Sequence, residues 1–297
     1  MFFGGPRFRE LTAEFIQHHN LRWEDRRTTA SNIRILERSI GDLRLKDITL
    51  LRIEAFQAAR LEDGISKSTV NRQIATLSAF FSWAIKRGHH PGPNPARDVE
   101  TFKESPGRMR FLTETEADRL ILAASEHLKP ILVAALHTGG RLSELLSLRW
   151  SDVNWDVPPY GMLTFRKETT KTRKARSLPL SPELARCLRG IRKRPADDRI
   201  FGFRGEAVTS IRTAFESARR KAGLDDLHFH DLRHTFASWY VQNTGDIYRL
   251  QKYLGHGTMK MTQRYAHLSQ SFLQDGVEFI GPPRHRSTQS QSDDRNS

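Results

Sequence analysis

A proline-rich interruption at residues 89–110 constrains the fold most, because no continuous helix or central strand can pass through it. The interruption contains four prolines, Pro91, Pro93, Pro95 and Pro106. Each proline lacks a backbone N–H and has a fixed φ, so a run of prolines ends regular secondary structure. Lys103, Arg108 and Arg110 keep the same stretch basic. The sequences on either side of it are therefore expected to fold separately.

The interruption divides the chain into two predicted domains. At 297 residues the chain is long enough for two domains that each bury a hydrophobic core. We expect a helical domain at residues 6–103, a basic linker at 104–110 and a second domain at 111–280. Residues 281–297 carry almost no apolar side chains, which predicts a disordered tail.

The first domain is predicted to be a small bundle of helices. Apolar residues recur every three or four positions, the period of an amphipathic helix, in four segments: 11–19, 27–41, 48–64 and 68–88. The clearest series is in the last segment, with Val70, Ile74, Leu77, Phe81 and Ala84. We expect Ser68 to cap the start of this helix and Gly88 to end it.

The second domain combines helices with a short hairpin. Thr113 and Glu116 match a capping box, in which an N-cap threonine is followed three residues later by glutamate. Residues 161–180 have the pattern of a β-hairpin with a long basic turn. Helical periodicity resumes at residue 181. The predicted fold class is mainly α with a small β-hairpin.

The charge of the chain favours a polyanionic partner. The formal net charge is +14 and the pI is about 10.3, with lysine and arginine spread along the whole length. This distribution suits a long nucleic acid held over a wide surface, although ribosomal and membrane-surface proteins can share it.

Other classes of protein are disfavoured by features that the sequence lacks. Cys187 is the only cysteine, which excludes an intramolecular disulfide and a cysteine-based zinc site. No stretch approaches the roughly 18 apolar residues that span a bilayer, and the first residues lack the apolar core of a signal peptide. We therefore expect a soluble intracellular protein. No glycine-rich nucleotide-binding loop is present, so we expect no cofactor.

Two candidate residues for chemistry lie in the first half of the second domain. Arg141 follows two glycines that interrupt a helix, so its guanidinium could hold a phosphate beside the free N–H groups of the next helix. An ordinary surface pair with Glu144 is the alternative. Lys171, on the basic hairpin turn, could protonate a leaving oxygen, whereas most such turns are simply solvated.

Two further motifs lie nearer the C-terminus. His230 and Arg233 are three residues apart, hence on one face of a helix, and could bind one oxyanion together. A capping histidine beside an ion-paired arginine is the alternative. We assign the adjacent His234 to packing or hydrogen bonding and leave it out of the active set. His256 falls in a turn and Tyr265 near the end of the next helical stretch, which alone would be commonplace.

Taken together, these motifs resemble the tyrosine recombinase family, which includes phage integrases and Xer-type resolvases. Four pieces stand in the family's order: TGGRLSELLSLRWSDV, TKTRKARSLPL, HDLRHTFAS and LGHGTMKMTQRYAH. The upstream segment STVNRQIATLSAFFSWAIKRG, followed by NPA, looks like the family's core-binding domain. The resemblance covers almost the whole chain. It implies a SAM-like helical core-binding domain followed by an α+β catalytic domain.

The resemblance also implies the catalytic residues and the reaction. The residues that match the family's catalytic positions are Arg141, Lys171, His230, Arg233, His256 and the nucleophile Tyr265. The implied activity is that of a site-specific recombinase or integrase, which cuts and rejoins duplex DNA through a 3′-phosphotyrosyl intermediate without metal or ATP. Gly140 departs from the family, which often has a bulkier apolar residue there, and this puts the local packing in doubt.

The implied partners are double-stranded recombination sites and further copies of the chain. Candidate DNA contacts outside the catalytic set are Lys67, Asn71, Arg72, Lys103, Arg108, Arg110, Arg173 and Lys174. A solvated helix end explains the first three almost equally well. The apolar residues of 271–280 resemble the family's element that docks on a neighbouring subunit, which favours a tetramer on DNA. Packing of this segment on its own domain is the alternative.

A cytoplasmic location, in a bacterium or as a phage-encoded protein, follows from these expectations. A strand-swivelling topoisomerase and a catalytically silent DNA-binding protein are the alternative functions. The sequence does not separate an integrase from a Xer-type resolvase, although no arm-binding domain is evident before Arg7, which favours a simple recombinase. Phosphate contacts carry no sequence information, so the target DNA cannot be read from these residues.

Overall fold

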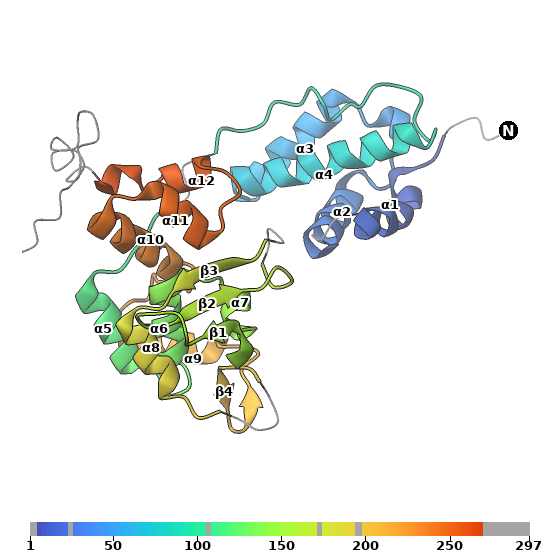
Figure 1. The fold of residues 1–297 in the computed structure, drawn as a ribbon. Coiled ribbons are helices and arrows are strands. Elements are labelled where there is room, and N and C mark those ends of the chain that lie inside the picture. Colours follow the sequence, from blue (N-terminus) through green and yellow to red (C-terminus); the bar gives the residue numbers. More distant parts are fainter. Residues whose placement is uncertain (1–4, 23–25, 105–107, 171–173, 194–197, 270–297) are drawn as a thin grey trace, which may run out of the picture. The chain divides into compact units, whose positions relative to one another are not determined.

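The computed structural model of the chain describes all residues except 1–4, 23–25, 105–107, 171–173, 194–197 and 270–297. The chain divides into two compact units, Met1–Gly107 and Arg108–Ser297, each with its own core (Figure 1). Helices dominate both units, and the strands form small antiparallel sheets in the second, which confirms the predicted fold class. Within the described residues, no helix is long and apolar enough to cross a membrane.

The described residues of the first unit form a bundle of four α-helices with one short 3-10 helix. Its elements are α1 (Phe8–Arg22), α2 (Arg26–Ile40), η1 (Leu45–Asp47), α3 (Leu50–Glu62) and α4 (Lys67–Lys86). Helix α4 packs against α2 and α3, and α1 packs against α2. The apolar face of α4 meets α1 in an aromatic cluster, in which Phe80 contacts Phe8 and Phe15 with ring centroids 4.5 and 5.3 Å apart.

The cap of α4 differs from the prediction. The helix begins at Lys67, so Ser68 lies inside the first turn and cannot be the N-cap. Ser66 occupies that position in an extended conformation, and its hydroxyl accepts a hydrogen bond from the Thr69 N–H. Both serines have the right chemistry, and the backbone conformation alone selects between them.

The second unit surrounds a small three-stranded sheet with helices (Figure 1). The elements before the sheet are α5 (Glu114–Ala123), α6 (Lys129–Thr138), α7 (Leu142–Leu146) and η2 (Trp150–Asp152). The sheet has the order β1 (Val153–Asn154), β2 (Met162–Phe165) and β3 (Arg176–Pro179), all antiparallel. The elements after it are α8 (Pro182–Arg189), β4 (Gly202–Phe203), β5 (Glu206–Ala207), α9 (Arg212–Lys221), α10 (Asp231–Thr244), α11 (Ile247–Leu254), α12 (Lys260–Gln263) and η3 (Ala266–Ser269).

Several predicted boundaries of the second unit are confirmed. The β2–β3 hairpin pairs Met162 through Phe165 with Pro179 through Arg176. Thr113 and Glu116 form the expected capping box at the start of α5. Gly139, the first of the two glycines before Arg141, ends α6 as expected, and the structure shows that Gly255 likewise ends α11; both are left-handed with φ near +60°. Because that conformation is strained for residues with a Cβ, these glycines fix where the chain turns into the site described next.

Helix α10 is enclosed by other elements, packing against α6, α11 and η3. Its buried residues include the polar side chains Arg233, His234 and Thr235 as well as the apolar Leu232 and Ala237. Burial of a polar side chain costs free energy unless it is hydrogen-bonded, so these groups need partners inside the protein. Those partners define the candidate site.

Candidate active site

Arg141 is held at the start of α7 by a fully buried carboxylate. Glu144 accepts hydrogen bonds from the Arg141 backbone N–H and from its Nη1, both at 2.9 Å. The Glu144 side chain is 0% exposed, whereas that of Arg141 is 21% exposed. The ion pair expected as the simpler explanation therefore exists. It leaves the guanidinium partly open to solvent, where it can also meet a ligand.

Gly140 is fitted closely to its surroundings. A Cβ built on it would lie 2.8 Å from Leu145 Cδ2 and 2.9 Å from Phe165 Cζ, both well inside van der Waals contact. Leu145 and Phe165 belong to the core of the unit. The absence of a side chain at Gly140 thus allows α7 to approach strand β2, and the departure from the family pattern is matched by local packing.

Arg176 is a site residue that the sequence reading missed. It lies in the basic hairpin segment 161–180, as the first residue of β3, and is 8% exposed. Its Nη2 lies 2.6 Å from Oε2 of Glu144, its Nε donates to the Tyr253 carbonyl, and its guanidinium lies over the Phe165 ring. The alternation that buries Leu178 could have placed Arg176 on the same inward face.

Glu144 consequently serves two arginines at once. Burial acts to raise the pKa of its carboxyl, but the hydrogen bond and charge of Arg176, together with the hydrogen bonds from Arg141, outweigh burial and lower it. The carboxylate is therefore ionised at neutral pH. It fixes both guanidinium groups relative to each other across α7 and β3.

Arg233 links the ends of two helices. Its Nη1 donates to the Gly139 carbonyl and its Nη2 to the Leu254 carbonyl, both at 2.6 Å. These carbonyls belong to the C-terminal turns of α6 and α11, which carry partial negative charge. Burial first, and then the charges of Arg141 and Arg176, lower the pKa of Arg233 to about 9. The cation persists at neutral pH and would be stabilised further by an anion.

Two histidines lie within the field of these arginines. His230 is the N-cap of α10, and His256 follows the glycine that ends α11. The pKa of His230 is lowered by burial and then by Arg233 and Arg141. The pKa of His256 is lowered to about 3 by burial and by the same arginines, and its Nδ1 lies 2.8 Å from Thr262 Oγ1. Both rings are therefore neutral at pH 7.

Tyr265 is 2% exposed and follows Arg264, the C-cap of α12. Burial raises the pKa of its phenol, while the charges of Arg233 and Arg264 partly offset that rise. Its hydroxyl lies 2.6 Å from Nδ1 of His234. The hydrogen-bonding role predicted for His234 is thus present, and its partner is the candidate nucleophile.

The predicted proton donor Lys171 and the predicted DNA contact Arg173 lie outside the described residues. Lys174, the first described residue after them, is exposed, and its backbone carbonyl accepts a hydrogen bond from the Thr170 hydroxyl. At Lys174, therefore, the backbone is hydrogen-bonded within the turn and the side chain is exposed to solvent.

The candidate DNA contacts of the first unit differ among themselves. Lys67, Arg72 and Lys103 are exposed. The Asn71 amide instead donates to the Phe102 carbonyl and accepts from the Phe102 N–H, both at 2.9 Å, and donates to Glu104 at 3.0 Å. Asn71 thus fastens the end of the first unit to α4, which is a structural role.

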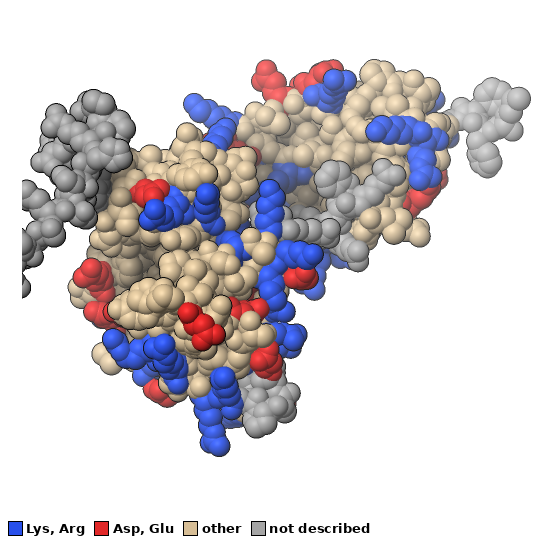
Figure 2. Space-filling view, viewed as in Figure 1, with Lys and Arg blue, Asp and Glu red and all other residues tan. Residues whose placement is uncertain are grey.

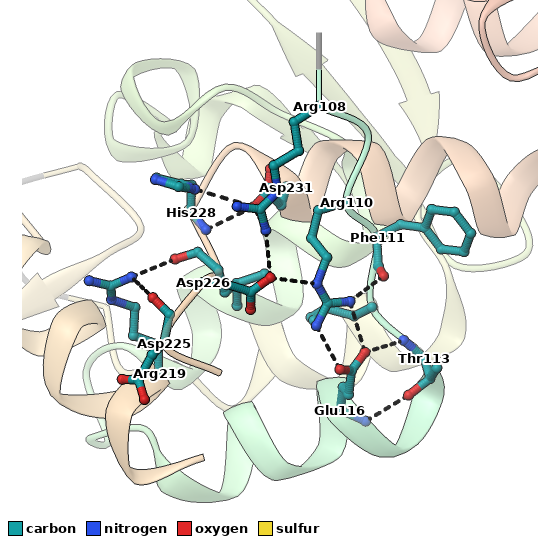
Figure 3. Close-up of polar contacts among 12 residues, drawn as sticks. Arg108, Arg110, Phe111, Thr113, Glu116, Arg219, Asp225, Asp226, His228 and Asp231 are labelled. Atoms are coloured by element: carbon teal, nitrogen blue, oxygen red, sulfur yellow. Dashed lines mark hydrogen bonds and ion pairs between the residues drawn. The ribbon is translucent and has the colours of Figure 1, made fainter. Parts of the chain in front are cut away.

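Arg108 and Arg110 are engaged in ion pairs within the second unit (Figure 3). Arg110 forms two hydrogen bonds with the carboxylate of Glu116, at 2.6 and 3.0 Å, and a third with Asp226. Arg108 donates to the same Asp226 carboxylate at 2.7 Å. The Arg110 side chain is only 21% exposed, so most of its charge is used to anchor the residues that lead into α5.

The site as a whole is suited to an oxyanion. Two guanidinium groups, those of Arg141 and Arg176, bind the buried carboxylate of Glu144, and Arg233 lies close enough for their charges to lower its pKa. An anion placed beside these arginines would gain charge-assisted interactions. Lysine and arginine are also scattered over the visible face of each unit, as expected for a polyanion-binding protein (Figure 2).

Comparison with known proteins identifies relatives over most of the chain. Residues 110–271 match the phage integrase family, and residues 6–103 match the phage integrase N-terminal domain. Over 221 residues the chain is 32% identical to the integrase of Escherichia phage 186. The aligned region covers 72% of this chain but only 60% of that integrase, which is less than two thirds of its length. Over 273 residues it is 30% identical to the putative integrase of Pseudomonas phage Pf1, covering 90% and 77%.

Solved structures with the same fold agree with this relationship. The Tn1549 transposon integrase in complex with transposon right end DNA is similar over 92% of this chain and 100% of that one, with a TM-score of 0.76 and 18% identity. The lambda integrase tetramer bound to a Holliday junction is similar over 88% and 77%, with a TM-score of 0.72 and 23% identity. Given the family match across more than half of its length, the chain belongs to the phage integrase family.

Proposed function

We propose that the protein is a tyrosine-type site-specific DNA recombinase whose nucleophile is Tyr265. The observation that carries this proposal is the position of the buried Tyr265 hydroxyl within the electrostatic field of Arg233, whose own pKa is lowered by burial and then by the charge of Arg141. These residues come from three separate segments of the second unit. A phosphodiester is the anion that such a set would attack.

The proposed reaction is a transfer of the DNA phosphoryl group to Tyr265. An ordinary phenol has a pKa near 10, so Tyr265 must lose its proton as its oxygen attacks phosphorus. We assign that proton to His230. Arg141 and Arg233 stabilise the charge that develops on the non-bridging oxygens, and His256 adds a further hydrogen bond. Loss of one such donor typically raises the barrier by about 3 kcal/mol.

The reaction also requires a proton donor for the leaving group. Lys171 protonates the departing 5′ oxygen, which leaves a 3′-phosphotyrosyl bond and a free 5′ hydroxyl. Because the phosphotyrosyl ester conserves the energy of the broken phosphodiester bond, a 5′ hydroxyl from another duplex can attack it and reverse the step. The strands are then exchanged between the two duplexes. The lambda integrase tetramer on a Holliday junction supports assembly of this chain as a tetramer on two duplexes. Its phage and bacterial relatives support a cytoplasmic location.

The direct test is trapping of a covalent adduct. Nicked suicide duplexes, tiled across the DNA that flanks the gene, are incubated with the protein and resolved under denaturing conditions. Tyr265→Phe should abolish the adduct and leave DNA binding largely intact. Tyr248→Phe, which alters a 60% exposed tyrosine on α11, is the matched control and should keep it. An adduct at wild-type level with Tyr265→Phe would contradict the proposal.

The same experiment separates the alternative functions. A catalytically silent DNA-binding protein would retard the duplexes but give no adduct. A strand-swivelling topoisomerase would relax supercoiled plasmids that lack any flanking sequence. A recombinase should instead form adducts only on duplexes from one part of the flanking DNA.

A further inference from the structure

The contact between His234 and Tyr265 assigns a role to a residue outside the proposed catalytic set. The Nδ1 atom of His234 lies 2.6 Å from the Tyr265 hydroxyl oxygen, a short hydrogen bond. Both residues are almost fully buried, at 8% and 2% exposure. The two rings also lie close to each other, with centroids 5.9 Å apart. The phenol is therefore held in one position by a specific partner.

The direction of this hydrogen bond follows from the protonation states. Burial, followed by the charges of His230 and Arg264, lowers the pKa of His234 to about 4, so its ring is neutral at pH 7. Burial raises the pKa of Tyr265, so its phenol is also neutral. A phenol O–H can then donate to Nδ1, provided that the histidine proton is on Nε2.

The same values decide between two roles for His234. Burial raises the pKa of the Tyr265 phenol and lowers that of the His234 imidazole to about 4, so transfer of the proton from the phenol to this imidazole is strongly uphill. His234 is thus a poor base in the DNA-free protein. A neutral imidazole at this distance is nevertheless a good hydrogen-bond acceptor, and it remains one throughout the physiological pH range.

We propose that His234 is a positioning residue that orients the Tyr265 hydroxyl for attack on the DNA phosphate. Acceptance of the O–H at Nδ1 fixes the position of the phenol oxygen before DNA binds and directs an oxygen lone pair away from His234. As that oxygen attacks phosphorus, the proton leaves this hydrogen bond for His230, whose ring centroid lies 5.3 Å from that of His234. Helix α10 carries both His234 and Arg233, so one rigid element sets the nucleophile and a phosphate-binding arginine relative to each other. This inference rests on the proposed role of Tyr265 as the nucleophile.

A pair of substitutions that differ only in the position of the amide tests the proposal. His234→Asn places a side-chain oxygen near the position of Nδ1, whereas His234→Gln places its amide near the position of Nε2. Both variants are polar and similar in size, so a difference between them reports on the acceptor and not on polarity. The exposed His267, replaced by asparagine and by glutamine, supplies the matched control.

The measurement is the single-turnover rate of adduct formation on the suicide duplex, at saturating protein. His234→Gln should lower this rate on the order of 100-fold, because a misplaced nucleophile loses its favourable alignment. His234→Asn should stay within about tenfold of the wild type, and the Kd for DNA should be unchanged in both. The His267 variants should match the wild type.

Two results would overturn the inference without touching the proposed function. One is a wild-type rate for His234→Gln, and the other is an equal loss of rate in both His234 variants. Melting temperatures identify a variant that fails to fold. Should His234→Gln not fold, a loss of rate in folded His234→Asn as large as that expected for glutamine would contradict the inference. Persistence of the adduct in Tyr265→Phe, in contrast, would refute the proposed function itself.

Discussion

Glu144 and Arg176 form a buried ion pair, with Oε2 of the carboxylate 2.6 Å from Nη2 of the guanidinium and both side chains at most 6% exposed. The pair joins the helix that follows Arg141 to the strand that follows the basic turn. Because Glu144 also binds the Arg141 side chain, the position of one proposed phosphate ligand depends on this contact.

Glu144→Gln should therefore reduce both stability and activity. Removing the charge leaves two guanidinium groups near each other with no carboxylate between them, and breaking a buried ion pair costs about 3–5 kcal/mol. Urea unfolding should show a loss of that order, and adduct formation should slow. The control is Glu126→Gln, which removes a 90% exposed partner of Lys129 and should cost less than about 1 kcal/mol. Equal effects of the two substitutions would contradict the assigned role.

Gly140→Ala should destabilise the second unit by overpacking. The new methyl group would lie 2.8–2.9 Å from Leu145 and Phe165, whose side chains are both fully buried in the core. Overpacking of this kind costs about 1–3 kcal/mol. Gly190→Ala is the control, because its methyl group would meet only backbone oxygens at 3.5 and 3.6 Å. A shift in melting temperature for Gly140→Ala no larger than for Gly190→Ala would show that the site accommodates a side chain.

Asn71 and Arg72 should behave oppositely although they are neighbours. Asn71→Ala leaves the Phe102 N–H and carbonyl without their partner and should cost about 1–3 kcal/mol of stability. Arg72→Gln should leave stability nearly unchanged, because the side chain is exposed. If Arg72 contacts a DNA phosphate, its loss should reduce the slope of log Kd against log salt by about one, and Asn71→Ala should not. Binding measured at several salt concentrations distinguishes these outcomes.

The boundaries of the fold were accessible from sequence because they depend on local chemistry. Gly139 and Gly255 end helices through their own backbone conformation, and Thr113 caps a helix through a residue three positions away. Ser68 shows the limit of this reasoning, since a neighbouring serine, Ser66, meets the same chemical requirement and the structure uses that one. Local signals locate a helix end only to within a residue or two.

The contacts within the site were less accessible because they join distant parts of the chain. The sequence around Arg176 is rich in basic residues, and only the pairing of Arg176 with Glu144, 32 residues earlier, reveals a buried role. His234 was assigned to hydrogen bonding, but its partner Tyr265 lies 31 residues later. The types of residue were enough to predict that the site binds an anion. Which side chains position the anion-binding arginines and Tyr265 depends on how α10 packs against the rest of the unit, and the sequence does not specify that packing locally.

The lowered pKa values of the buried histidines predict a loss of stability in mild acid. His234 and His256 protonate near pH 6.5 in the unfolded chain but only near pH 4 and 3 in the folded protein. Between pH 6.5 and 4 the unfolded state therefore binds more protons, so stability is fully present above pH 6.5 and is lost as the pH falls. The shifts of His137 and His230 act in the same direction.

Urea unfolding at pH 7 and pH 5 measures this loss and keeps the carboxylates largely ionised. Each of the two most strongly shifted histidines should contribute up to about 2 kcal/mol over that interval. His256→Asn, which removes the titrating ring and retains a polar atom near Thr262, should reduce the difference between the two pH values by a similar amount. His267→Asn, at an exposed position, should leave the difference unchanged. The same pH dependence in His256→Asn and in the wild type would mean that His256 is protonated as readily in the folded chain as in the unfolded one.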